Sequence, residues 1–293
     1  GDHRDLHSYP ARRSSDLFVL FLASLLVIQK IKLPIWARAL LIVLDLAVVM
    51  PIVGVSSGTF ARVATMIGIY AILSMGLNIV VGYTGLLNLG YAAFYAVGAY
   101  LYAIFASSQA SEFMPFGVYP LSGNWFWLFL LLAMVVTGFV GFLLGLPVLR
   151  LKGDYLAVVT LGFAEIIRLL FNNLSKPINI TNGPMGITPI QPPKLFNLVL
   201  NQPVHYYAIV LVLLLLTVVL VRNLQNSRIG RAWVAIREDE LVARTMGVPV
   251  VRMKLLSFSI AAGLAGMMGV VFAAMQSFVD PTSFTFMESI VIL

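Results

Sequence analysis

The chain of 293 residues is 60% hydrophobic and only 11% charged, with a mean hydropathy of +0.96. It has too little polar surface to coat a soluble globule of this size, so the composition excludes that class and predicts an integral membrane protein. The net charge of +7 does not indicate nucleic-acid binding, because the basic residues fall in short loops between apolar runs.

The sequence contains few of the residue patterns that are typical of catalysis or of metal and nucleotide binding. Cysteine is absent, which excludes disulfides and thiolate metal sites, and the three histidines are scattered at His3, His7 and His205. A phosphate loop of the form G-x-x-x-x-G-K-S/T does not occur, so any ATP-driven activity would need ATPases on other chains. We expect no catalytic residue, no metal site and no cofactor on this chain.

The two ends of the chain are unusual. Residues 7–17 resemble the translation of a sequencing-adapter oligonucleotide, so we expect residues 1–16 to be a foreign or disordered tail. A natural basic tail on lipid headgroups is the alternative. The last residues, 290–293, end within an apolar run. We therefore interpret residues 17–293 as a transmembrane domain that is incomplete at its C-terminus.

The apolar runs predict an all-α, polytopic transmembrane bundle, since a helix needs roughly 20 apolar residues to cross the hydrocarbon core. A shorter run, residues 17–28, is interpreted as the stump of a span or as an interfacial segment. We place the spans at residues 35–55, 61–81, 86–106, 125–149, 155–171, 204–221 and 255–278.

The bundle is organised around residues 63–106, which contain no charged side chain. This run is about twice the length of one span, so it predicts two helices that turn at Gly82 and Gly85. A turn at membrane depth is tolerated only where protein or a water-filled cavity surrounds it. Because small residues let helices approach closely, we expect a tightly packed bundle with this Gly-interrupted element at its centre.

The basic residues predict the orientation, since short loops rich in Lys and Arg stay in the cytoplasm. The densest basic cluster, residues 222–254, is therefore placed inside, together with Lys30, Lys32, Arg150 and Lys152. Counting spans from these markers places two segments outside, residues 106–124 and the proline-rich residues 172–203.

Within residues 222–254 the pattern predicts a short amphipathic helix. Asp239 can cap it, Gly247 can end it and Pro249 prevents its continuation. Leu241, Val242 and Met246 would then form an apolar ridge between Glu240 and Arg244. Two interpretations stay open: a helix at the lipid interface, or a helix that docks in a groove of a cytoplasmic partner. The docking candidates are Arg237, Glu238, Asp239, Glu240, Leu241, Val242, Ala243, Arg244, Met246 and Gly247.

Two carboxylates fall near the middle of predicted spans. No Lys or Arg stands three or four residues from Asp45 in the sequence, so two alternatives stay open: a protonated carboxyl, or a bond to another span. Arg168 follows Glu165 by three residues and can pair with it on one helix face. Since buried carboxylates usually face the bundle interior, both structural pairing and a role in a pathway stay open for Glu165.

Four segments carry a resemblance: residues 76–90 (GLNIVVGYTGLLNLG), 153–163 (GDYLAVVTLGF), 181–184 (TNGP) and 231–247. With them the chain resembles the permease subunits of bacterial high-affinity branched-chain amino acid ABC importers, closer to the LivM type than to the LivH type. The likeness covers residues 60–293. The importer coupling pattern is met only loosely, by Glu240, Ala243 and Gly247.

The resemblance implies a multi-pass protein of the inner membrane. It would translocate leucine, isoleucine or valine from a periplasmic binding protein, beside a second permease of the LivH type and two cytoplasmic ATPase subunits that bind the ATP. Relatives that move urea or short amides leave the solute open. An ion-coupled secondary transporter and a membrane scaffold are the alternatives from other classes.

The spans at 61–81 and 255–278 run in opposite directions by this orientation, and each is followed by a turn and a second apolar run. They predict an inverted repeat, residues 61–106 against 255–293, with the pathway between the halves. The pathway candidates are Asn78, Asn88, Gly266 and Glu165.

Overall fold

The computed structural model describes residues 41, 44–46, 51, 58–112, 119–148, 154–175, 179–195 and 198–293. The predicted tail, the apolar run 17–28 and most of the span 35–55 lie outside the described residues. Arg150, Lys152 and the lysines near residue 30 do so as well.

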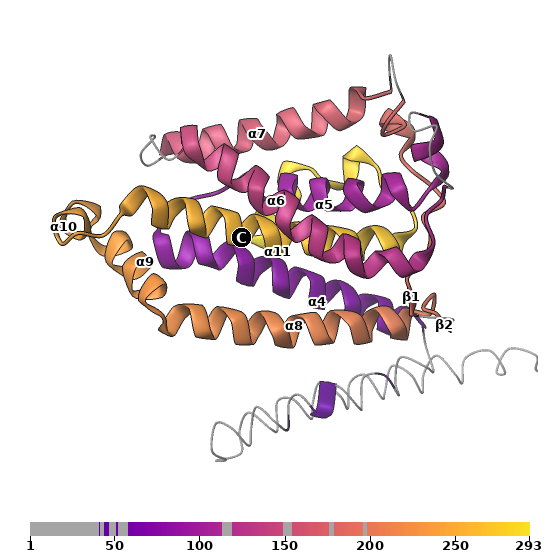
Figure 1. The fold of residues 1–293 in the computed structure, drawn as a ribbon, viewed down its shortest axis with the longest axis horizontal. Coiled ribbons are helices and arrows are strands. Elements are labelled where there is room, and N and C mark those ends of the chain that lie inside the picture. The colour runs from indigo at the N-terminus through magenta and orange to yellow at the C-terminus, as the bar shows by residue number, and fades with distance from the viewer. Residues whose placement is uncertain are drawn as a thin grey trace, which may run out of the picture. The chain divides into compact units, whose positions relative to one another are not determined.

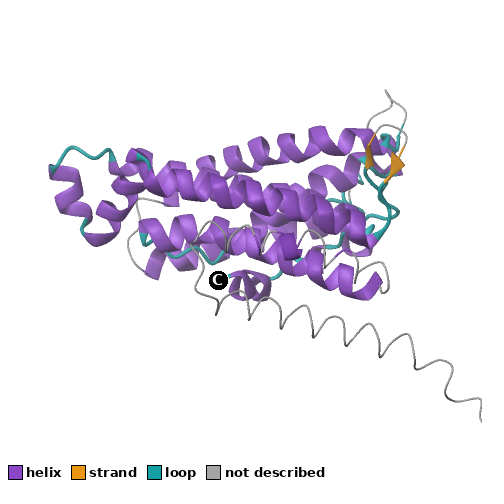
Figure 2. Cartoon of the chain, turned by 90° about the horizontal axis from the view of Figure 1, so that it is seen from below, coloured by secondary structure: helices purple, strands orange, loops and turns teal. Residues whose placement is uncertain are grey.

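The described residues are almost entirely helical, and the single pair of short strands lies among the loops (Figure 2). Strand β1 pairs antiparallel with β2, with Lys194 opposite Val199. The elements are α4 (Gly58–Asn78), the π-helical η2 (Ile79–Tyr83), α5 (Tyr91–Phe105), the 3-10 turns η3 (Ser108–Glu112) and η4 (Gly123–Trp125), α6 (Phe126–Val148), α7 (Asp154–Asn173), η5 (Gly183–Met185), β1 (Lys194–Leu195), β2 (Leu198–Val199), α8 (Pro203–Asn226), α9 (Arg228–Glu238), α10 (Glu240–Thr245), α11 (Val250–Gln276), η6 (Pro281–Ser283) and α12 (Phe286–Ile292).

Five helical segments of the described residues are long and apolar enough to cross a membrane. They confirm five predicted spans, those at 61–81, 125–149, 155–171, 204–221 and 255–278. The segments are Gly58–Tyr83, Gly123–Pro147, Tyr155–Asn173, Pro203–Asn226 and Val250–Gln276.

The predicted span 86–106 is wrong in its first part, because α5 begins only at Tyr91 and has 15 residues. Residues 85–90 are irregular. Gly85 takes a left-handed φ of +70°, and the Asn88 side chain accepts a hydrogen bond from the Gly90 amide at 3.0 Å, which closes a turn instead of a helix. The Leu89 amide donates to the Thr160 hydroxyl of α7. The Leu89 and Gly90 amides of this irregular backbone are therefore paired with protein groups, as a turn at membrane depth requires.

The described chain divides into two compact units, residues 1–68 with 201–215 and residues 69–200 with 216–293. In the smaller unit the Tyr207 hydroxyl donates to the Leu46 carbonyl at 2.9 Å, and the Tyr207 ring packs on Phe60 and Ala64. Asp45 is buried beside this contact. A side chain at Gly68 would meet Val210, so the first half of α4 lies close against α8.

In the larger unit, α11 is the central helix and packs on α5 and α6 (Figure 1). A β-carbon at Gly98 of α5 would overlap the backbone of Gly266, and one at Gly269 would overlap the Tyr95 carbonyl. Helix α6 approaches α11 as closely, since a β-carbon at Gly141 would lie 2.6 Å from the Ala262 side chain. The expected close packing through small residues is confirmed: these backbones touch.

The loops predicted to lie outside gather at one end of the larger unit, which we call the loop end. There the Gln191 amide donates to the Ala106 carbonyl at 2.9 Å, and Ile187 pairs with Val279 just after α11. Helices α9 and α10 lie at the opposite end of α11 (Figure 1). The described parts of the two loops therefore lie at one end of this unit and residues 222–254 at the other, as predicted; which end faces the cytoplasm stays a prediction.

The second half of α4 and helix α11 run in opposite directions. Helix α4 ends in η2, beside α9 at the start of α11, because Arg237 donates to the Gly82 carbonyl. Each of the two is followed by a shorter helix, α5 and α12. This arrangement agrees with the opposite directions expected for the repeat. The two-fold relation between residues 61–106 and 255–293 stays a prediction.

Candidate functional site

Helices α9 and α10 are defined by side-chain caps. The Ser227 hydroxyl accepts hydrogen bonds from the Ile229 and Gly230 amides at 3.1 and 3.2 Å. The Asp239 carboxylate accepts from the Leu241 and Val242 amides at 2.8 and 3.0 Å. Because these side chains satisfy amides that a helix start leaves unpaired, the chain breaks into two helices at Asp239. The predicted cap is confirmed.

The end of α10 is equally definite. Gly247 takes a φ of +85° and its amide donates to the Arg244 carbonyl at 3.1 Å. The Val248 amide donates to the Ala243 carbonyl at 3.0 Å, and Pro249 then precedes α11. A left-handed glycine with these bonds is a common helix stop, so the predicted end at Gly247 is also confirmed.

One face of α9 and α10 packs against the start of α11. Trp233 is fully buried, and its indole nitrogen donates to the Met253 carbonyl at 2.8 Å. Ile236, Ala243 and Val250 form a small apolar core there. Ala243 therefore supports α10 from inside, and it offers no surface for docking.

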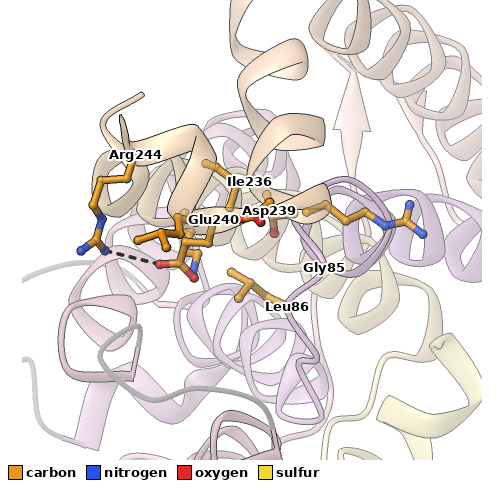
Figure 3. A pocket seen from close by; sticks show the side chains of 10 residues that line it. Gly85, Leu86, Ile236, Asp239, Glu240 and Arg244 are labelled. Carbon is orange, nitrogen blue, oxygen red and sulfur yellow. Dashed lines mark hydrogen bonds and ion pairs between the residues drawn. The ribbon is translucent and has the colours of Figure 1, made fainter. Parts of the chain in front are cut away.

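An ion-pair network ties α10 to α11. One Glu240 carboxylate oxygen lies 2.8 Å from the Lys254 ammonium, and the other lies 3.5 Å from the Arg244 guanidinium (Figure 3). The Lys254 side chain is 8% exposed and that of Arg244 is 63% exposed. The contact to Lys254 is thus shielded from water and salt, whereas the contact to Arg244 is screened.

A pocket of about 430 Å³ separates this helix pair from the turn after η2 (Figure 3). Arg237 bridges its edge, since it donates to the Gly82 carbonyl at 2.6 Å. The helix pair is therefore joined to the Gly-interrupted element. The lining residues are Thr84, Gly85, Leu86, Ile236, Arg237, Asp239, Glu240, Leu241, Arg244 and Lys254.

The exposed surface of α10, which borders the pocket at Leu241, carries the predicted apolar ridge. Leu241, Val242 and Met246 are 71%, 55% and 79% exposed. Glu238 and Gly247 are exposed beside them. Large apolar side chains held on a short, capped helix form a surface that suits a partner's groove or the membrane interface.

The four pathway candidates have different surroundings. Asn78 is exposed at the end of α4, and its side chain covers Gly82. Asn88 is buried and closes the turn before α5. Gly266 is buried in the contact of α11 with Gly98, which is helix packing.

Glu165 pairs with Arg168, as predicted, through the guanidinium Nη2 and through Nε at 3.1 Å. Both side chains are partly exposed, 45% for Glu165 and 30% for Arg168. The pairing is confirmed, and a pathway role stays a prediction.

The sequence interpretation missed Lys254 and the pocket residues Thr84 and Leu86. From the sequence, Lys254 only helps to predict which loops lie in the cytoplasm, whereas in the structure it is the buried ion-pair partner of Glu240. Fourteen residues separate the two in sequence, so no helix-face rule relates them. Its position directly before an apolar run was the one available signal.

The fold and the site together define a polytopic helical membrane protein with a capped, exposed helix at one end. The family described as "Branched-chain amino acid transport system / permease component" matches residues 59–293. The chain belongs to this family. No solved structure matches it significantly.

Three relatives are named as branched-chain amino acid transport permease proteins LivM. The chain is 41% identical to the Salmonella typhimurium protein over 90% of this chain and 62% of that protein. It is 42% identical to the Escherichia coli protein, over 87% and 61%. A probable LivM of Methanocaldococcus jannaschii is 25% identical, over 74% and 68%. The chain thus spans less than two thirds of the length of the two bacterial relatives.

Proposed function

We propose that this chain is the membrane-spanning permease subunit of an ATP-driven importer in a bacterial inner membrane. Its substrates are leucine, isoleucine and valine, delivered by a periplasmic binding protein. A second, LivH-type permease and two cytoplasmic ATPases complete the complex, and ATP binds to the ATPases. The family match over residues 59–293 carries this proposal, because all three relatives bear the name of this transport permease.

Within this function, α10 is the contact for an ATPase subunit. Three properties support the assignment: the exposed ridge of Leu241, Val242 and Met246, the caps that fix the helix, and the Glu240–Lys254 contact that ties it to α11. A force applied to α10 would reach α11 and, through Arg237, the turn at Gly82. Coupling of ATP hydrolysis to transport requires such a connection between the ATPase contact and the transmembrane helices.

The test is leucine uptake into proteoliposomes that hold the complete complex and the binding protein. The double variant Leu241→Asp with Met246→Asp should reduce uptake by about tenfold or more, since loss of a hot-spot contact costs about 2 kcal/mol. Val234→Asp is the matched control: Val234 is 44% exposed on the neighbouring helix α9. Its uptake should stay within about twofold of the parent.

Other results would overturn parts of the proposal. Unchanged uptake in the double variant removes the docking role of α10. Equal losses in the double variant and in Val234→Asp indicate a helix at the membrane surface. Uptake that needs an ion gradient instead of ATP identifies a secondary transporter, and competition by urea or short amides but not by leucine changes the substrate.

A further inference from the structure

Glu288 brings a carboxylate to the middle of the apolar region. It lies in the first turn of α12, and its Oε2 accepts a hydrogen bond of 2.6 Å from the Tyr70 hydroxyl. Tyr70 is the thirteenth residue of the 26-residue helical segment Gly58–Tyr83. The contact therefore lies at half the length of a segment that is long enough to span the membrane.

A second contact of α12 gives the same depth. The Ser289 hydroxyl accepts a hydrogen bond of 3.0 Å from the Ala92 amide, in the first turn of α5. The 15 residues of α5 extend from there to the loop end, a distance of about 22 Å at a rise of about 1.5 Å per residue. The hydrocarbon core is about 30 Å thick. Helix α12 thus enters the membrane region and does not lie on its surface.

No fixed cation among the described residues balances this carboxylate. Among the described residues, no Lys, Arg or His forms an ion pair with Glu288, whereas Glu165 pairs with Arg168 and Glu240 with Lys254. The Tyr70 hydroxyl contacts one of its oxygens, and Glu288 is only partly buried. A carboxylate at such depth is costly and marks a substrate or ion pathway by default.

The neighbourhood of Glu288 is aromatic. The Tyr95 ring lies 5.3 Å from the rings of both Phe272 and Phe284, between centroids, and Tyr95 is close enough to interact electrostatically with Glu288. These three rings are buried, whereas Glu288 is partly exposed next to them, so a charged group lies in apolar surroundings, as suits a small amphiphilic solute.

We propose that Glu288 and Tyr70 bind the ammonium group of a zwitterionic amino acid as it crosses the permease. This site deepens the proposed function and rests on it, because that function supplies the amine. The ammonium donates charge-assisted hydrogen bonds to the carboxylate, and the Tyr70 hydroxyl, which already donates to Oε2, holds that carboxylate in place. Since no Lys, Arg or His among the described residues pairs with Glu288, the ammonium group of the solute can serve as its counter-ion.

The test uses the complete complex with Glu288→Gln, which keeps an oxygen to accept the Tyr70 hydrogen bond and removes only the charge. Two quantities are measured: kcat/KM for leucine uptake, and the affinity of the purified complex for radiolabelled leucine, which needs no ATP hydrolysis. Both should fall by about 10- to 100-fold, as expected for loss of a charge-assisted contact. Glu288→Asp should retain part of the binding, and ATP hydrolysis by the complex should persist.

The matched control is Ser74→Ala, since the Ser74 hydroxyl donates to the Ile292 carbonyl at 2.8 Å and seats α12 without touching the carboxylate. It should bind and transport leucine within about twofold of the parent.

The proposal is overturned if Glu288→Gln binds leucine with the affinity of the parent, or if Ser74→Ala loses as much affinity as Glu288→Gln. If leucine uptake by the parent depends on a proton gradient and uptake by Glu288→Gln does not, the carboxylate carries protons instead of binding the ammonium group. A complex that binds leucine through Glu288 without ATP-driven uptake keeps the site and refutes the proposed function.

Discussion

The α9–α10 pair and the contact of α5 with α11 are stabilised by different forces, although they belong to the same unit. Side-chain caps at Ser227 and Asp239 and the Glu240–Lys254 ion pair define the first region. Backbone contact defines the second, because Gly98 lies against Gly266 with no room for a side chain. In lipid no hydrophobic force draws helices together, so packing depends on close approach, whereas an end exposed to water can use polar groups.

The carboxylates of the two environments differ in the same way. Glu240 is balanced by Lys254 at 2.8 Å and Arg244 at 3.5 Å. Glu288 has the Tyr70 hydroxyl at 2.6 Å and no ion pair among the described residues. A structural carboxylate is neutralised by its own chain, whereas one that lacks a cation is available to a ligand. Three substitutions test the comparison, in order of decreasing effect on stability.

The largest effect is expected for Gly98→Val. The new side chain would overlap the Gly266 backbone, which cannot move aside without separating α5 from α11. We expect a loss of about 3 kcal/mol or more, or no folded protein, because overpacking here forces a backbone shift. Thermal unfolding in detergent measures it. The control is Gly162→Ala on α7, where a β-carbon meets nothing within 4 Å; equal losses in the two variants would contradict the packing argument.

A medium effect is expected for Lys254→Met, which leaves Glu240 without its shielded partner. Removing one partner of a fully buried pair costs about 3–5 kcal/mol; Glu240 is 35% exposed, so we expect less here, about 2 kcal/mol. Faster hydrogen exchange at the α10 amides would report it. Arg244→Met removes only the screened contact and should change exchange by no more than about 0.5 kcal/mol. If both variants behave alike, Lys254 is not the anchor.

The smallest effect is expected for Asp239→Ala, which removes the acceptor for the Leu241 and Val242 amides. Loss of such a cap costs about 1 kcal/mol, confined to α10. Exchange at these two amides should accelerate while that of α11 stays unchanged. Glu238→Ala removes the same charge from the neighbouring position, where it caps no helix, and serves as control; acceleration in both variants would point to charge instead of capping.

The α10 region could be predicted from the sequence almost residue by residue. Its start at Asp239, its end at Gly247 and its ridge of Leu241, Val242 and Met246 are set by contacts within about four residues, which local rules describe. The pairing of Glu165 with Arg168 is local in the same sense. The inward position of Ala243 could not be predicted, because it depends on Ile236 and Val250 in neighbouring helices.

The α5 region was predicted only in outline. The apolar run 86–106 satisfies the length rule for a span, yet α5 starts at Tyr91, because the turn closed by Asn88 is also anchored on Thr160 of α7. Glu288 was not recognised at all. Its position seven residues after Pro281 resembles that of a loop residue, and only the contact with Tyr70, 218 residues away, reveals its depth.

The sequence by itself determined that the chain is a helical membrane protein, where its long spans lie, and which end carries the capped helix. Composition and contacts within a few residues decide these properties, since apolar length and caps act locally. Only the tertiary structure decided that α11 packs on both α5 and α6, that Lys254 holds Glu240, and that Glu288 lies at mid-depth beside Tyr70. These features depend on groups from distant parts of the chain, which meet only when the helices pack.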